Sequence, residues 1–332
     1  MPSFRRQLAL AFLSTGTLIV LAVSPHLLGG RVADAVDGLG DAEPTRLWLA
    51  ALLFVSMHAS SGLAWGVASR ACGTTIDNVD AIARYGVGSG LNAIAPFRLG
   101  SAVRVALFAR VSEADGALWQ AGGAAAAVGA VRAVWFASLV GVAAAAGVVP
   151  AWPLVLIAIA VGAGVGAAIL SRRVPLQRRL GLVLQAFQAL SRAPRSLARV
   201  ALLTGTGLGF KVAAVTAIAA AFGVERPLAA ALVVVPAIEL AAVLPVTPGN
   251  AGVASAAVAF ALGAHGVEAT TALAAGIAFG ATEMLASIAV GAAGALTLAG
   301  PVVRPALRRT AVGVLSASVS LAFAITVVLP AL

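Results

Sequence analysis

The chain has 332 residues, of which 61% are hydrophobic and only 10% are charged, and its mean hydropathy is +1.03. Such a composition excludes a soluble globular domain and predicts an all-α polytopic membrane protein. The net charge of +10 does not indicate a nucleic-acid partner, because basic residues in membrane proteins mark the loops that stay in the cytoplasm. The single cysteine, Cys72, excludes an intrachain disulfide, and the three histidines have no metal-ligand spacing. We therefore expect neither a metal site nor another cofactor.

Seven apolar runs are long enough to cross a bilayer, which requires about 20 residues of helix. Two further apolar regions, near residues 80–110 and 228–264, are interrupted by proline and glycine. We interpret each interrupted region as a re-entrant helical hairpin with its tip at the break, and an ordinary pair of short or kinked helices is the alternative. The expected spans lie near residues 8–28, 47–69, 118–148, 152–170, 200–222, 268–298 and 311–329.

The two interruptions occur at matching places in the two halves of the chain. When Pro96 is aligned with Pro245, Gly100 falls on Gly249. Unwound backbone survives at membrane depth only where protein or a wet cavity satisfies it, and such paired breaks point to a transport site between inverted repeats. The residues expected at the hairpin tips are Pro96, Gly100, Pro245, Pro248, Gly249 and Gly252.

The distribution of arginine predicts the orientation of the chain. If the N-terminus is cytoplasmic and both hairpins re-enter without crossing, most arginines fall on the cytoplasmic side. Residues 1–150 then form a first inverted repeat, residues 151–300 form a second one of opposite orientation, and residues 301–332 add a final transmembrane helix that ends outside. The basic segment 171–199 is either an interfacial amphipathic helix that contacts anionic headgroups or a solvated loop.

The first break predicts an anion site. Arg98 lies at the tip, Ser101 is the expected N-cap of the next helix, and Arg104 follows one to two turns later. Free N–H groups at a helix N-terminus and nearby guanidinium groups bind phosphate oxygens. Arg132 lies well inside the 118–148 run, where a buried arginine is costly and usually faces a partner or a wet cavity. The alternative is that the arginines at the break snorkel to the interface.

The second break carries no charge. Thr247 and Asn250 offer polar atoms to a headgroup, and Asn250 is the expected N-cap of the following helix, although a hinge needed only for packing explains the same pattern. Three more ionisable residues lie at membrane depth, where they either pair with one another and with the arginine of the 118–148 run or couple transport to an ion. These residues are Lys211, Glu239 and Glu283.

The sequence offers little that could support catalysis. It has no Walker-type phosphate loop, no Ser/His/Asp or Cys/His arrangement that can be defended, and no carboxylate cluster for a metal. We therefore expect a protein that is not an enzyme, with an intramembrane transferase as the alternative.

The first break resembles a family signature. Residues Asn92 to Arg104 are similar to N-x-x-x-P-x-R-x-G-D-x-x-R of the lysylphosphatidylglycerol synthase transmembrane-region family, which is also called flippase-like. Residues Leu244 to Ser255 are similar to its second signature, L-P-x-x-P-G-G-L-G-V-x-E. The resemblance implies an integral membrane protein that moves a polar lipid across the bilayer. Because this chain has no attached synthase domain, the lipid would be made by another protein.

The chain departs from the family pattern at three charged positions. Ser101 stands where the first signature has aspartate, Ser255 where the second has glutamate, and Gly280 where the following helix often has arginine. The glutamate and the arginine are both absent, as expected if one ion pair was removed as a unit. These departures put the family's transport mechanism and substrate in question for this chain.

We therefore predict a flippase-like protein of the cytoplasmic membrane that translocates an anionic or phosphate-bearing lipid, such as a phospholipid, a glycolipid or a lipid-linked precursor. The alternative is a scaffold subunit, without transport activity, of a lipid- or glycan-modifying enzyme. Its expected partners are membrane lipids and a separate enzyme of that kind, and the abundance of small residues permits a homodimer.

Overall fold

The computed structural model describes residues 38–95, 99–112, 115–147, 185, 187–241 and 251–299. Within these ranges the chain is helical apart from short turns, and no strand occurs there. The all-α class is therefore confirmed. The expected spans 8–28, 152–170 and 311–329 lie outside the described residues, as does most of the segment 171–199.

The first half of the described chain places two short helices between two long ones. A 3-10 turn, η2 (Gly38–Asp41), precedes the long helix α3 (Pro44–Ala71), which has 28 residues, and α6 (Ala117–Ala145) has 29. The short helices α4 (Asn78–Ile94) and α5 (Leu99–Ala109) have 17 and 11 residues. At 1.5 Å per residue, α5 covers roughly 16 Å of a hydrocarbon core that is ~30 Å thick. The region 80–110 is thus interrupted as expected.

The second half repeats this order of lengths. The long helices α9 (Pro194–Ala221) and α12 (Ala269–Leu298) have 28 and 30 residues. The short helices between them, α10 (Pro227–Ala241) and α11 (Ala251–Ala264), have 15 and 14 residues. The helices α3, α6, α9 and α12 are long and apolar enough to cross a membrane, and they lie where the sequence predicted spans near 47–69, 118–148, 200–222 and 268–298.

The helices α3 and α9 begin and end with the same local signals. Each has a proline in its first turn, where φ is already helical and no hydrogen bond is lost. Each is followed by a left-handed glycine, Gly73 with a φ of 92° and Gly223 with a φ of 69°. The N–H groups of each glycine and of the next residue donate to carbonyls of the last turn over 3.0–3.3 Å, which is a Schellman motif. The proline start also explains why α9 begins at Pro194 rather than near residue 200.

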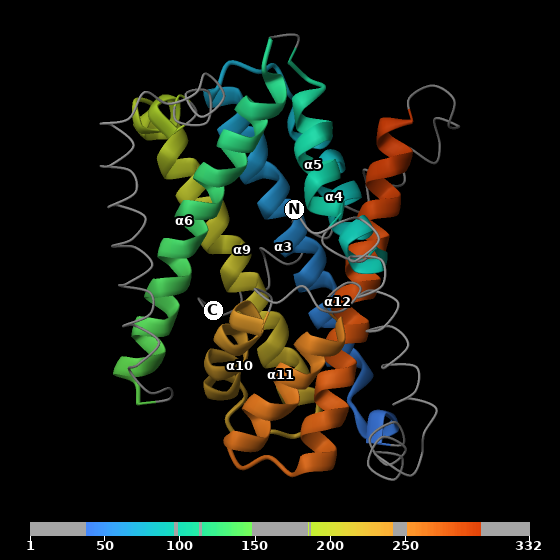
Figure 1. The fold of residues 1–332 in the computed structure, drawn as a ribbon. Coiled ribbons are helices and arrows are strands. Elements are labelled where there is room, and N and C mark those ends of the chain that lie inside the picture. The colour runs from blue at the N-terminus through green and yellow to red at the C-terminus, as the bar shows by residue number, and fades with distance from the viewer. Residues whose placement is uncertain are drawn as a thin grey trace, which may run out of the picture.

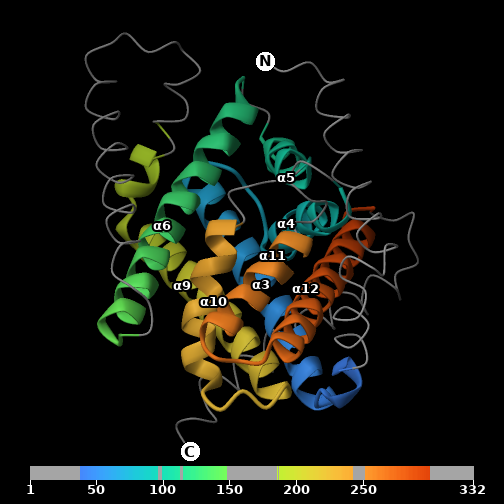
Figure 2. The ribbon, with the colours of Figure 1, turned by 60° about the horizontal axis from the view of Figure 1, so that its bottom comes forward.

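The two halves use corresponding helix contacts. The helices α3 and α9 pack on each other through the centre of the bundle, while α4 and α12 lie side by side at one edge and α6 lies at the opposite edge (Figures 1 and 2). Helix α3 packs on α4 as α9 packs on α10, and the short helices pair as α4 with α5 and as α10 with α11. Likewise, α12 contacts α4 and α6 contacts α10.

Glycines bring α4 and α12 into direct backbone contact. A Cβ atom added to Gly90 would lie 2.9 Å from Cα of Gly291, and one added to Gly86 would lie 2.7 Å from the carbonyl oxygen of Val290. Since real Cβ atoms do not approach backbone so closely, only glycine fits at these positions. Small residues at such a seam allow helices to associate in lipid through close van der Waals packing.

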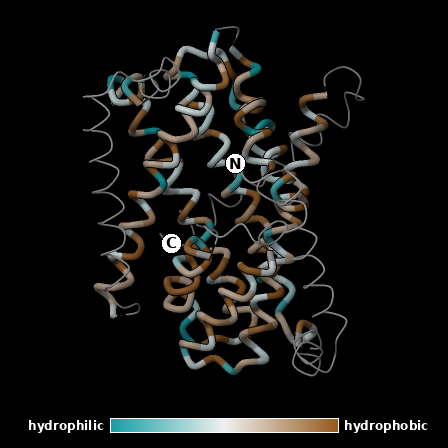
Figure 3. Tube along the Cα trace, viewed as in Figure 1, coloured by the Kyte–Doolittle hydropathy of each residue, from teal (hydrophilic) through white to brown (hydrophobic). Residues whose placement is uncertain are grey.

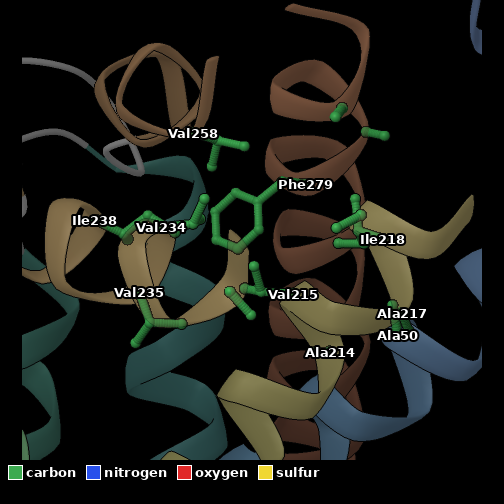
Figure 4. Close-up of a cluster of buried hydrophobic side chains, with 14 of the residues drawn as sticks. Ala50, Ala214, Val215, Ala217, Ile218, Val234, Val235, Ile238, Val258 and Phe279 are labelled. Carbon is green, nitrogen blue, oxygen red and sulfur yellow. The ribbon is translucent and has the colours of Figure 1, made fainter. Parts of the chain in front are cut away.

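A hydrophobic core joins α3, α9, α10, α11 and α12. Phe279 of α12 points into it and is surrounded by Val215, Val234 and Val258 (Figure 4). Its ring also meets Phe54 of α3 edge to face, with centroids 5.6 Å apart and planes at 79°. Hydrophilic positions gather mainly at the two ends of the bundle, with a few halfway along it (Figure 3). These central polar positions define the candidate site.

Candidate functional site

The first break lies between two helices that a signature residue ties together. The Asn92 side chain near the end of α4 donates from Nδ2 to Oγ of Ser101 over 3.0 Å and accepts the Ser101 N–H at Oδ1 over 3.1 Å. Gly100 lies so close to Gly88 and Asn92 that a Cβ atom there would collide with both. The motif residues therefore close α4 and α5 into a hairpin. Ser101 is not the N-cap expected from the sequence, because α5 already begins at Leu99.

Arg104 is held inside this hairpin by aromatic and hydroxyl partners. Its guanidinium carbon lies 3.9 Å from the ring centroid of Tyr85 and 5.7 Å from that of Trp65. Its Nη2 donates to Oγ of Ser89 over 2.9 Å. The aromatic faces attract the cation, so the structure gives Arg104 partners on the protein itself.

Several residues of the predicted site lie outside the described residues. At the first break, Pro96 and Arg98 lie outside the described residues. At the second break the same is true of Pro245, Thr247, Pro248, Gly249 and Asn250. Gly252 lies in the first turn of α11, which begins at Ala251.

Three of the predicted ionisable residues meet halfway through the bundle. Oε1 of Glu239 lies 2.6 Å from Nη2 of Arg132 and 2.9 Å from Nζ of Lys211. One carboxylate thus joins α6, α9 and α10. The exposed fractions of the side chains are 7% for lysine, 19% for glutamate and 46% for arginine. The lysine side chain is enclosed, whereas the arginine side chain is partly exposed. The sequence had left open whether these residues pair, and the structure shows that they do.

Glu283 completes this group from a fourth helix. It lies near the middle of α12, and its electrostatic neighbours are Lys211, Glu239 and Arg132. Among the described residues, no ion pair involves its carboxylate. We refer to Arg132, Lys211, Glu239 and Glu283 as the central charged cluster. Its formal charges balance, but a single carboxylate contacts both cations.

A second polar group, on α3, α4 and α12, was missed by sequence reasoning. Nε2 of His58 and Oγ of Ser287 are 3.0 Å apart, and the histidine is only 7% exposed. Its ring centroid lies 6.3 Å from that of Tyr85, and the Tyr85 ring also contacts the guanidinium of Arg104. A signal existed in the sequence, because three serines surround this histidine in an otherwise apolar run. They are Ser56, Ser60 and Ser61.

Two of the three positions where family charges are absent lie on or near one helix contact. A Cβ atom added to Gly276 of α12 would collide with the backbone of Ser255 on α11. Gly280 follows Gly276 by one helical turn and is buried. The α11–α12 contact is therefore closed by small residues at the place where the family signature has charge.

The fold and the charged cluster define a multi-pass membrane protein with ionisable groups in its interior. The family model described as the lysylphosphatidylglycerol synthase TM region matches residues 7–291 of the chain. The chain therefore belongs to this family, as its two signatures indicated. No curated protein matches the chain.

Proposed function

We propose that the protein translocates an anionic or phosphate-bearing polar lipid across the cytoplasmic membrane, with the N-terminus inside and the C-terminus outside. The headgroup would cross at the central charged cluster while the hydrocarbon chains stay in the bilayer. Membership of a lipid-related membrane family supports the substrate class. No catalytic step is part of the proposal.

One observation carries this proposal. Arg132 lies at the middle of a membrane-length helix, is 46% exposed, and shares its carboxylate partner with Lys211. An arginine at this depth is costly unless it faces a partner or a wet cavity. An arginine whose side chain is partly exposed and whose carboxylate partner is shared with a lysine is suited to bind phosphate oxygens, which a guanidinium can contact through two N–H groups.

The breaks give the headgroup a path. Glu239 lies two residues before the end of α10 at Ala241, so the cluster adjoins the second interruption. The matched helix lengths and corresponding contacts of the two halves support inverted repeats with one re-entrant hairpin in each. The headgroup path would then run between the two interruptions, with Arg98, Thr247 and Asn250 at the hairpin tips. Glu239 and Glu283 are the groups available for coupling to an ion.

A flipping assay tests the proposal. The purified protein is reconstituted in vesicles that contain a fluorescent anionic phospholipid, and a membrane-impermeant reductant is added outside. The reductant removes the outer-leaflet signal in every sample, so loss of fluorescence beyond the outer-leaflet fraction reports exchange between leaflets. We expect wild-type protein to accelerate exchange and Arg132→Gln to abolish the acceleration. Arg84→Gln is the matched control, because Arg84 pairs with Asp80 on α4, away from the cluster.

Native mass spectrometry provides the complementary measurement. A phosphate-bearing lipid retained by wild-type protein and lost from the Arg98→Ala/Arg132→Ala variant would support the headgroup site and name the lipid. Identical, unselective lipid on both proteins, together with full exchange in the Arg132→Gln variant, would favour a scaffold for a lipid- or glycan-modifying enzyme.

A further inference from the structure

An open cavity of about 910 Å³ lies along α6 and α9, with α3 and the start of α10 at its edges. We call it the α6–α9 groove. On α9 its lining extends from Gly205 to Ala220, and on α6 from Trp135 to Val142. At 1.5 Å per residue the α9 side is roughly 22 Å long, which exceeds half of the ~30 Å hydrocarbon core. The groove is therefore longer than the hydrocarbon depth of one leaflet.

Three polar side chains in the groove have hydrogen-bond partners on the protein itself. The hydroxyl of Ser138 donates to the carbonyl of Val134 over 3.0 Å, and that of Thr216 donates to Val212 over 2.8 Å. The indole N–H of Trp135 donates to a carbonyl of α9 over 2.8 Å. Because these donors are engaged, the groove offers a ligand mainly hydrocarbon surface.

The two ends of the groove differ in available charge. At one end, Arg46 is neutralised by Glu43, with Nε and Oε2 2.7 Å apart, and its Nη1 donates to the carbonyl of Ala220 over 2.5 Å. At the other end, Arg132 precedes Trp135 by about one turn of α6 and shares its carboxylate with Lys211. An anionic group on a long hydrocarbon chain is therefore matched at the Arg132 end.

We propose that the α6–α9 groove holds one acyl chain of a phospholipid whose phosphate lies at Arg132. The inference deepens the proposed function, because it names the part of the lipid that the protein binds outside the charged cluster. Charge complementarity at Arg132 and continuous apolar surface at membrane depth select this occupant. A chain that moves here from lipid does not leave water and gains only packing, so the groove selects for chain shape rather than adding large affinity.

A photoreactive lipid tests the groove directly. The probe is phosphatidylglycerol with a diazirine near the end of one acyl chain, incorporated into phosphatidylcholine vesicles that contain the whole protein. We expect labelled peptides from α6 and α9. Gly209 lines the groove, and a Cβ atom there would meet nothing within 4 Å. The variant Gly209→Phe should therefore fold and lower labelling of these peptides about tenfold, which corresponds to about 1.4 kcal/mol.

The matched control is Gly122→Phe on α6. A Cβ atom at Gly122 also meets nothing within 4 Å, but this residue does not line the groove. Labelling equal to wild type is expected for this control. Equal labelling of Gly209→Phe and wild type would overturn the proposal, as would label confined to other helices. Crosslinks between the groove and the apolar stretch 152–170 of the same chain would also overturn it, since the groove would then be filled by the protein.

A second probe separates this inference from the proposed function. The same diazirine on phosphatidylcholine tests the chain alone, and the phosphatidylglycerol probe tests chain and anionic headgroup together. We expect Arg132→Gln to reduce the preference for the anionic probe while groove labelling by both probes persists. If wild-type protein labels in the groove but does not exchange lipid between leaflets, the groove inference holds and the transport proposal fails.

Discussion

The two edges of the bundle are formed by corresponding helices that pack in opposite ways. At one edge, α4 and α12 meet through glycines, with Gly90 and Gly291 in backbone contact. At the other edge, α6 and α10 contact each other much less and are joined by the ion pair of Arg132 and Glu239. One edge is held by close van der Waals packing and the other by charge. The same helix arrangement can therefore give a sealed seam or an accessible polar site, depending on the residues at the contact.

The charged edge should give the largest effect on stability. Replacing Glu239 with glutamine leaves Lys211, which is only 7% exposed, without its carboxylate. Removing one partner of a buried pair costs about 3–5 kcal/mol, so we expect the Glu239→Gln variant to unfold at a clearly lower temperature in detergent. The double variant Glu239→Gln/Lys211→Gln should recover most of the loss. A single variant as stable as wild type would show that this edge does not depend on charge.

Filling the glycine seam should give the next largest effect. Gly291→Leu forces side-chain atoms against the backbone of α4, and overpacking of this kind costs about 1–3 kcal/mol. The measurement is thermal unfolding, with Gly122→Leu as control because space is open there. If both variants unfold at the same temperature, the close packing of α4 and α12 does not stabilise the fold.

The hairpin beside the glycine seam should respond more weakly. Asn92→Ala removes two hydrogen bonds to Ser101, and membrane-embedded hydrogen bonds contribute about 0.6 kcal/mol each. We expect a loss of about 1 kcal/mol and faster hydrogen exchange in α5 than in α11. Asn92→Asp keeps the acceptor for the Ser101 N–H and should lie between wild type and alanine. If the rate of hydrogen exchange in α5 is the same in Asn92→Ala and wild type, Asn92 does not hold α5 against α4.

The smallest effect is expected at the aromatic support of Arg104. Tyr85→Leu removes the ring that lies 3.9 Å from the guanidinium carbon, whereas Tyr85→Phe keeps a ring there. A cation–π contact contributes about 0.5–2 kcal/mol, so leucine should destabilise the protein by about 1 kcal/mol more than phenylalanine does. Equal unfolding temperatures for the two variants would rule out this contact as a stabilising one.

The sequence predicted those features that depend on local composition. The four long helices could be found because about 20 apolar residues in a row have few alternatives in a membrane protein. The interruptions could be found because proline removes a backbone N–H donor and glycine is entropically unfavourable inside a helix. The N-cap assignment of Ser101 was wrong because α5 already begins at Leu99. The serine instead bonds to Asn92 across the hairpin, a contact that helix-end rules do not include.

The candidate site was predicted only in part, because it depends on contacts between distant segments. Arg132, Lys211 and Glu239 could each be selected from the sequence as charges at membrane depth. That both cations bind the one carboxylate of Glu239 depends on how three helices pack, which the sequence alone does not give. His58 was passed over because its partner, Ser287, is far along the chain. The tips at Arg98 and Asn250 remain predictions.

The shared carboxylate of Glu239 has a consequence for exchange of partners. If an incoming phosphate takes over Arg132, the glutamate keeps Lys211, at 2.9 Å, as its counterion. Neither the carboxylate nor the enclosed ammonium group is then left alone in a low-dielectric interior, where an unpaired charge is costly. In a simple two-residue ion pair, a ligand that bound the cation would leave the carboxylate without a counterion. The triad of two cations and one anion thus allows a phosphate to replace the carboxylate as the partner of the guanidinium, while each of the three groups keeps an oppositely charged partner.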